Sequence, residues 1–133
     1  MDINFADLED IQRLKQARLQ VLRLHKALLD AERDAYERQH GRVASNLEFF
    51  NLVMNHEWFG WLQPMTQWIV AVDEAVAQKD PVITIGQAQD FLQAAVVLLE
   101  TEGEEATIDR YCMVIDRVPA VARLHEELCL ILA

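Results

Sequence analysis

Apolar side chains recur along residues 8–40 with the spacing of one face of an α-helix. At about 100° per residue, that face collects six residues: Ile11, Leu14, Val21, Leu22, Leu28 and Leu29. We expect one helix from about Ala6 to His40, about 50 Å long at 1.5 Å per residue. Gly41 is well suited to end it, because glycine tolerates the left-handed conformation that follows many helices.

A second helical segment begins at Ser45, and Glu48 three residues later gives it the spacing of a capping box. Its inner face is expected to hold Phe50, Val53 and Met54. Pro64 lacks a backbone donor and clashes with the preceding turn, so we expect the segment to kink there before it ends near residue 79.

Two more segments complete the pattern. Thr84 and Gln87 predict the cap of a third helix, and residues 104–132 form a fourth segment that is broken near Pro119. The short connections favour antiparallel neighbours. The sequence therefore predicts a single all-α domain over residues 1–133, an antiparallel four-helix bundle with a kinked second arm and a broken fourth arm.

Glu32 projects close to the centre of the predicted apolar face, with His25 two turns before it and Tyr36 one turn after. A buried carboxylate is costly unless it is paired, protonated or bound to a metal ion. The helical wheel places Glu57 inward as well, beside the aromatic residues of the second arm. The candidate ligand-binding residues are His25, Glu32, Tyr36, Glu57, Trp58 and Trp61.

Carboxylates and imidazoles from facing helices are the usual ingredients of metal sites in bundles. The candidate metal ligands are His25, Glu32, His56, Glu57 and His125. Their spacing fits neither a ferritin-like nor a hemerythrin-like site, so no cofactor is predicted and a metal ion stays an alternative. The main interpretation is a buried pair in which Glu32 or Glu57 meets Arg, Tyr or His from a neighbouring helix.

Trp58, Phe59, Trp61 and Trp68 lie within eleven residues, around a glycine and a proline. We interpret this aromatic cluster mainly as core filling where the second arm bends. A partially exposed Trp58 or Trp61 would instead suit dimerisation or ligand stacking.

The net charge of −10 is unevenly distributed. Residues 1–42 carry eight acids and eight bases, whereas residues 43–133 carry fourteen acids and four bases. The basic stretch 11–29 is expected to lie beside the acidic remainder, or to dock an acidic partner or a second copy. Nucleic-acid binding is not expected, because the overall charge repels phosphates and no binding motif is present.

The N-terminus has no signal-peptide pattern, and the longest apolar run, Ala94–Leu99, is too short to cross a bilayer. Cys112 and Cys129 are expected to be buried thiols in a reducing compartment. We therefore expect a cytoplasmic protein without a membrane partner. Motifs of catalytic nucleophiles and phosphate loops are absent, which does not favour an enzyme.

Several segments resemble a small uncharacterised bacterial family of helical bundles. They are Leu24–Arg33, Tyr36–Arg38, His40–Arg42, His56–Leu62 and Asp73–Glu74, and the likeness is taken to cover residues 24–76. The resemblance implies a bacterial cytosolic bundle and says nothing about chemistry.

Three hypotheses remain. The first is a non-catalytic helical interaction module that self-associates, with a homodimer as the expected form. The second is a bundle that binds a metal ion or a small ligand at its internal Glu/His site. The third is an acidic inhibitor or immunity-type protein that covers a basic protein partner.

Overall fold

The computed structural model describes residues 5–79, 81–100 and 106–133, and all regular structure in those ranges is helical. The elements are α1 (Phe5–His40), α2 (Asn46–Asn55), the 3₁₀ helix η1 (Glu57–Leu62), α3 (Gln63–Ala77), α4 (Ile85–Leu98), α5 (Ala106–Arg117) and α6 (Pro119–Leu132). The all-α prediction is confirmed. None of these helices has both the length and the apolar character needed to cross a membrane. The first two residues of the predicted fourth arm, 104–105, lie outside the described residues.

The long first helix is confirmed, and Gly41 follows it with a φ of +88°. The Gly41 N–H donates to the Glu37 carbonyl at 2.9 Å, which satisfies one of the last helical acceptors. The buried face is turned relative to the prediction, because Leu22 is 42% exposed while Leu24 is fully buried. Leu22 lies about 120° around the helix from Leu28, at the edge of the buried face.

The second arm changes direction earlier than predicted. Ser45 caps α2 by accepting from the Glu48 N–H at 3.1 Å, but the Glu48 carboxylate accepts from Ala44 rather than from Ser45. The helix ends at Asn55, and His56 is extended with φ −89° and ψ 135°. Pro64 lies in the first turn of α3, where its missing N–H costs no helical hydrogen bond. The bend therefore lies at His56 and η1, and Pro64 starts a helix instead of kinking one.

The caps of the later helices agree with the sequence. Thr84 and Gln87 form the predicted capping box, with reciprocal bonds of 3.1 Å and 2.9 Å. Val118 separates α5 from α6, and Pro119 is the first residue of α6.

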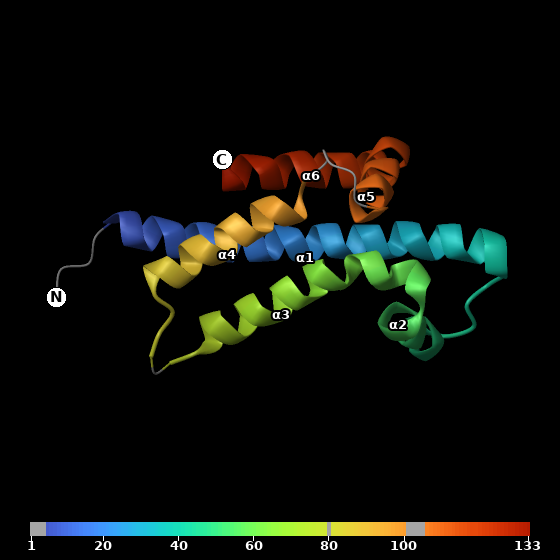
Figure 1. Ribbon diagram of the computed structural model, residues 1–133, viewed down its shortest axis with the longest axis horizontal. Coiled ribbons are helices and arrows are strands. Elements are labelled where there is room, and N and C mark those ends of the chain that lie inside the picture. Colours follow the sequence, from blue (N-terminus) through green and yellow to red (C-terminus); the bar gives the residue numbers. More distant parts are fainter. Residues whose placement is uncertain (1–4, 80, 101–105) are drawn as a thin grey trace.

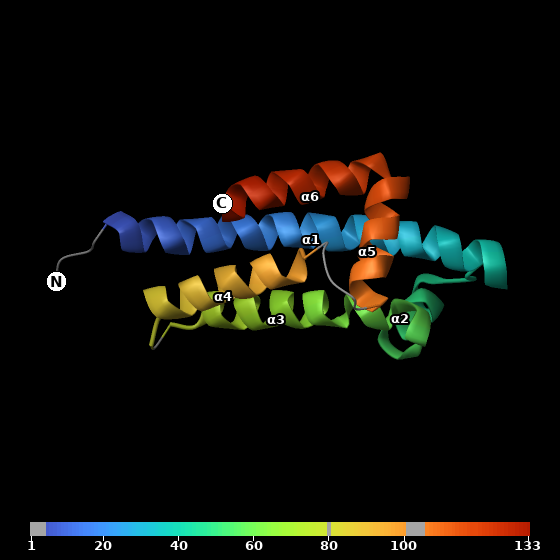
Figure 2. The same cartoon turned by 45° about the horizontal axis from the view of Figure 1, so that its top comes forward.

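Figure 1 shows α3 and α6 running opposite to α1, and α4 running in the same direction as α1. The turned view in Figure 2 shows α6 along one side of α1 and α3 with α4 along the other. Helix α2 and helix α5 lie across the long helices near the C-terminal half of α1. The core includes fully buried residues of α1 (Leu14, Leu24 and Leu28), η1 (Phe59), α3 (Val72), α4 (Ala88 and Ala95) and α6 (Val121 and Leu128).

Candidate functional site

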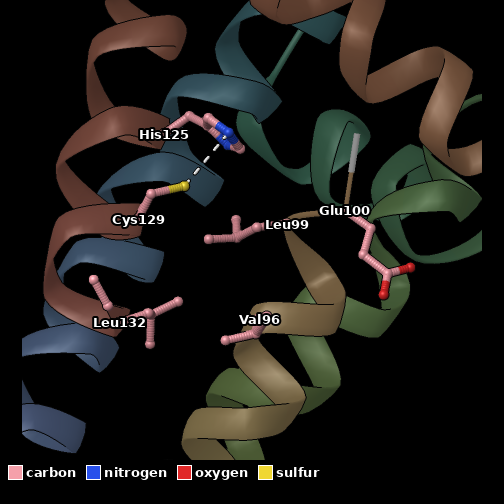
Figure 3. Close-up of a pocket in the computed structure, with 7 residues that line it drawn as sticks. Val96, Leu99, Glu100, His125, Cys129 and Leu132 are labelled. Carbon is pink, nitrogen blue, oxygen red and sulfur yellow. Dashed lines mark hydrogen bonds between the residues drawn. The ribbon is translucent and has the colours of Figure 1, made fainter. Parts of the chain in front are cut away.

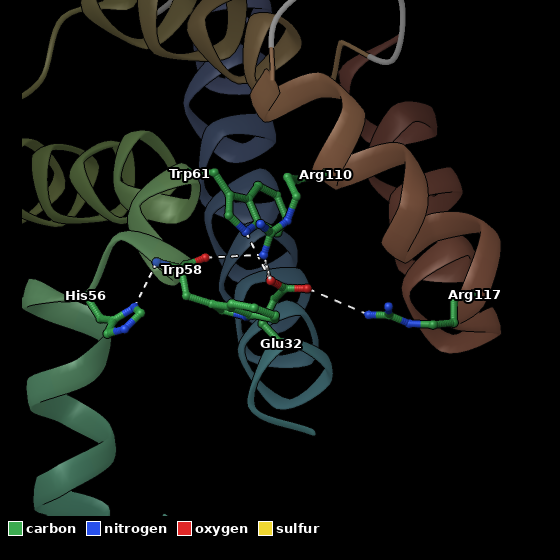
Figure 4. Close-up of polar contacts among 6 residues, drawn as sticks. All are labelled: Glu32, His56, Trp58, Trp61, Arg110 and Arg117. Atoms are coloured by element: carbon green, nitrogen blue, oxygen red, sulfur yellow. Dashed lines mark hydrogen bonds and ion pairs between the residues drawn. The ribbon is translucent and has the colours of Figure 1, made fainter. Parts of the chain in front are cut away.

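Glu32 lies at the meeting point of α1, η1 and α5, and its side chain is almost fully buried. Arg110 Nη2 donates to Glu32 Oε2 at 2.5 Å, and Trp61 Nε1 donates to the same oxygen at 3.3 Å. Arg117 Nη2 lies 3.7 Å from the other oxygen, Oε1 (Figure 4). The predicted buried pair is therefore present for Glu32, and both of its carboxylate oxygens have protein partners.

Arg110 extends this polar cluster to the aromatic residues of η1. Its guanidinium lies 5.0 Å from the Trp58 ring centroid and donates to the Trp58 carbonyl at 3.4 Å. The Arg110 guanidinium therefore makes both a cation–π contact and charge-assisted hydrogen bonds. The Glu32–Arg110 pair thus fixes the position of η1 and α5 against α1, which is the structural role expected of a buried ion pair.

Glu57 does not take part, and its predicted inward position is wrong because the side chain is exposed. The helical wheel assumed a continuous helix through His56, whereas α2 ends at Asn55. The half-buried face of α2 is also turned about its helix axis relative to the prediction, and of the three predicted inner residues Val53 alone packs against the core. This face holds Phe49, Leu52 and Val53, and the predicted inner residues Phe50 and Met54 are 60% and 49% exposed.

His25 is half-buried and has a partner of its own. Its Nε2 lies 2.9 Å from the Thr66 hydroxyl, which itself donates to the Leu62 carbonyl at 3.3 Å. Because that hydroxyl has one proton, His25 Nε2–H is the donor to Thr66. Burial lowers the pKa of His25, so the neutral imidazole is the folded form. His25 is thus a satisfied histidine bonded to α3.

Tyr36 belongs to a cluster of rings at the C-terminal end of α1. Its ring stacks on His40 with centroids 4.3 Å apart and contacts His56 and Trp58 edge-on. His56 Nδ1 accepts from the Trp58 N–H at 3.0 Å, which caps η1 (Figure 4). Trp58 is half-buried, and its indole nitrogen has no hydrogen-bond partner among the described residues. Together with the fully buried Phe59, these rings close one end of the core.

His125 on α6 forms a second polar group, which also contains Tyr111 and Cys129. Tyr111 Oη lies 2.6 Å from His125 Nδ1, and Cys129 Sγ lies 3.6 Å from His125 Nε2. Burial raises the pKa of Tyr111 and lowers that of His125. Burial, with the charge of Glu126, raises the pKa of Cys129.

Cys129 is exposed, so its predicted burial is wrong; Cys112 is half-buried. His125 and Cys129 are four positions apart, so the sequence alone could have placed their side chains one helical turn apart on the same face.

A cavity of about 580 Å³ opens beside this group, between α4 and α6. Figure 3 shows the Cys129 sulfur directed at the His125 ring, with Val96 of α4 and Leu99, the residue that follows α4, on the facing wall. The size lies within the range of small-molecule sites, and most of the lining is apolar.

The structure does not bring the five predicted metal ligands to one point. His25 is hydrogen-bonded to Thr66, Glu32 is hydrogen-bonded to Arg110 and ion-paired with Arg117, His56 accepts from the Trp58 N–H, and His125 is hydrogen-bonded to Tyr111. Within the described ranges, no group of three or more His, Cys, Asp or Glu side chains is placed to hold a metal ion.

One feature that sequence reasoning missed is the outer face of α2. Leu47, Phe50 and Met54 are 71%, 60% and 49% exposed, and we call these three residues the α2 stripe. Their spacing of three and four residues places them on one side of the helix. That spacing was present in the sequence, but Phe50 and Met54 were predicted to lie on the inner face and Leu47 was not considered.

Comparison of the chain with protein-family models, with curated protein sequences and with solved structures finds no match. The functional argument therefore depends on the geometry of this chain alone.

Proposed function

We propose that the protein is a non-catalytic interaction module that self-associates through the α2 stripe. The observation that carries the proposal is a helix with no buried residue that presents Leu47, Phe50 and Met54 to solvent. Exposed apolar residues at helical spacing are the pattern by which helices anchor in protein partners.

The rest of the structure holds α2 in a fixed position. The Phe49 ring packs edge-on against Phe59 at 5.7 Å, and the Arg33 guanidinium lies 4.7 Å from the Phe49 ring centroid. Gln63 Nε2 donates to the Val53 carbonyl at 3.3 Å, which ties the last turn of α2 to α3. A surface that is already ordered loses less entropy on binding than a mobile one. The α2 stripe is thus displayed on a supported helix.

A second copy of the chain is the partner that the α2 stripe fits. Phe50 lies near the middle of the stripe, so a two-fold antiparallel pairing would place Phe50 against Phe50 and Leu47 against Met54. Such an isologous contact is self-complementary. The stripe itself carries no charge, which gives a charged partner little to recognise.

Charges at the two ends of α2 favour the same arrangement. Arg42 precedes the helix, Glu57 follows it, and both side chains are exposed. In an antiparallel pair each Arg42 would approach the Glu57 of the other copy. Opposite charges at the rim of an interface contribute to orientation more than to affinity.

The long helices form the framework that carries α2. We propose that α1, α3, α4 and α6 form an antiparallel four-helix bundle, with α2 and α5 as crosswise additions. In support, α1 contacts α3, α4 and α6, while α4 contacts α3 and α6. The predictions of a bacterial family and a cytoplasmic location remain predictions.

The two other hypotheses have less support. An internal ligand site at Glu32 has less support because both carboxylate oxygens already have protein partners. The hypothesis of an acidic inhibitor is supported by the net charge of −10, and no contact among the described residues gives it further support.

The test is the mass of the chain in solution, measured by light scattering after size exclusion, with the variant Phe50→Glu. We expect wild type to form a concentration-dependent dimer, because three anchors cover less than the roughly 800 Å² per partner of a standard interface. Phe50→Glu should stay monomeric at every concentration.

Leu130→Glu is the matched control, since Leu130 on α6 is 77% exposed and lies outside the α2 stripe. It should dimerise like wild type. Equal loss of dimer in both variants would contradict the proposal.

A further inference from the structure

His125 and Cys129 lie one turn apart on α6, at the wall of the cavity between α4 and α6 (Figure 3). We propose that His125 Nε2 and Cys129 Sγ bind a borderline or soft divalent metal ion, with Zn²⁺ as the ion that this donor pair fits. Imidazole and thiolate together are typical zinc donors. This site is separate from the α2 stripe and does not depend on self-association.

The distance between the two donor atoms suits tetrahedral zinc. With Zn–S near 2.3 Å and Zn–N near 2.0–2.1 Å, a tetrahedral angle separates sulfur from nitrogen by about 3.5–3.6 Å. Cys129 Sγ and His125 Nε2 are 3.6 Å apart. The two side chains therefore already have the separation that one bound ion requires.

Tyr111 supplies the second contact that zinc-binding histidines usually have. Its hydroxyl lies 2.6 Å from His125 Nδ1, and the tyrosine is only 3% exposed. Metal binding at Nε2 requires the tautomer in which Nδ1–H donates to the Tyr111 hydroxyl, and in that tautomer the Nε2 lone pair lies on the sulfur side of the ring. Such an outer contact fixes both the tautomer and the ring orientation of a metal-binding histidine.

The local charge favours a cation. Burial is the larger influence on the pKa values of His125 and Cys129, and the nearby Glu126 carboxylate adds a negative charge that acts on both. No third metal-ligating side chain joins the pair among the described residues. The cavity of about 580 Å³ leaves room for water molecules at the remaining coordination positions. The structure thus points to an open, exchangeable site and not to a closed structural zinc site.

The experiment uses the untagged, reduced chain and Co²⁺ as a spectroscopic probe for Zn²⁺. Thiolate coordination gives a sulfur-to-cobalt charge-transfer band in the near ultraviolet, and tetrahedral geometry gives strong visible d–d bands. We expect both to appear, to saturate at one ion per chain and to be displaced by Zn²⁺. A titration without these bands would overturn the proposal.

Three variants assign the ligands. Cys129→Ser should abolish the charge-transfer band, and His125→Gln should weaken binding and change the d–d bands. Cys112→Ser is the matched control and should leave the spectra unchanged. Cys129 is exposed, so its substitution should preserve the circular dichroism spectrum and the urea midpoint. A charge-transfer band that survives Cys129→Ser, or that is lost with Cys112→Ser, would contradict the assignment.

Discussion

Glu32 and Arg110 are separated by 78 positions in the chain and are joined by a hydrogen bond of 2.5 Å. The two partners differ in their contact with water. The Glu32 side chain is 3% exposed, whereas that of Arg110 is 36% exposed. Removing the arginine therefore leaves a charge in the core, while removing the carboxylate leaves a charge that water still reaches.

This asymmetry predicts unequal effects on stability. Arg110→Met should lower the free energy of unfolding by about 3 kcal/mol, because it leaves the buried carboxylate with weaker partners. Glu32→Gln should cost about 1.5 kcal/mol, at the low end for a hydrogen bond to a charged group. Urea denaturation of both variants measures the difference. The double variant should be more stable than Arg110→Met alone, and the reverse order would contradict this role.

Truncation of two phenylalanines nine positions apart should change the free energy of unfolding by very different amounts. Phe59 is fully buried, so Phe59→Ala should cost about 3–5 kcal/mol of unfolding free energy. Phe50 is 60% exposed, so Phe50→Ala should change monomer stability by no more than about 0.5 kcal/mol. Thermal or urea unfolding at low protein concentration measures the free energy of unfolding of both variants. Similar losses in both variants would show that α2 is packed differently from the structure.

Stability should fall below neutral pH partly through His25. Burial lowers the pKa of folded His25, so as pH falls the unfolded state takes up a proton first. The contribution of His25 is therefore complete above about pH 6.5 and is lost on further acidification. His25→Gln should flatten the decline of unfolding free energy between pH 7 and pH 5.

Part of the slope should remain in that variant, because burial also lowers the pKa of His125. A wild-type slope in His25→Gln would contradict the assignment to His25.

Charge reversal at the ends of α2 tests the orientation of the proposed pair. Arg42→Glu should weaken dimerisation, since two acidic groups would then meet at each end. Adding Glu57→Arg should restore it by exchanging the partners. Sedimentation equilibrium at low ionic strength measures both, because rim charges are screened by salt. Failure of the second change to rescue the first would argue against the antiparallel arrangement.

The sequence predicted the all-α class and the limits of most helices from features that act locally. Gly41, the Thr84–Gln87 box and Pro119 each fix a helix end through their own backbone requirements. The burial of Glu32 followed from the same kind of reasoning, because helical period places it near the apolar side of α1.

Long-range arrangement could not be predicted in the same way. Arg110 meets Glu32 because α5 crosses α1 near Glu32. The local sequence pattern does not say where along α1 this crossing falls. Glu57 was misplaced because the wheel was continued past His56, where the helix stops. Phe50 was misplaced because α2 has two apolar faces, and the pattern alone does not say which one meets the core.

The central claim is that the α2 stripe joins two copies of the chain, and sedimentation equilibrium of wild type beside Phe50→Glu tests it most directly. The account predicts that the wild-type mass rises with concentration from 15.3 kDa toward twice that value, while the variant stays at 15.3 kDa. A wild-type mass of 15.3 kDa at all concentrations, or a variant that dimerises like wild type, would contradict it.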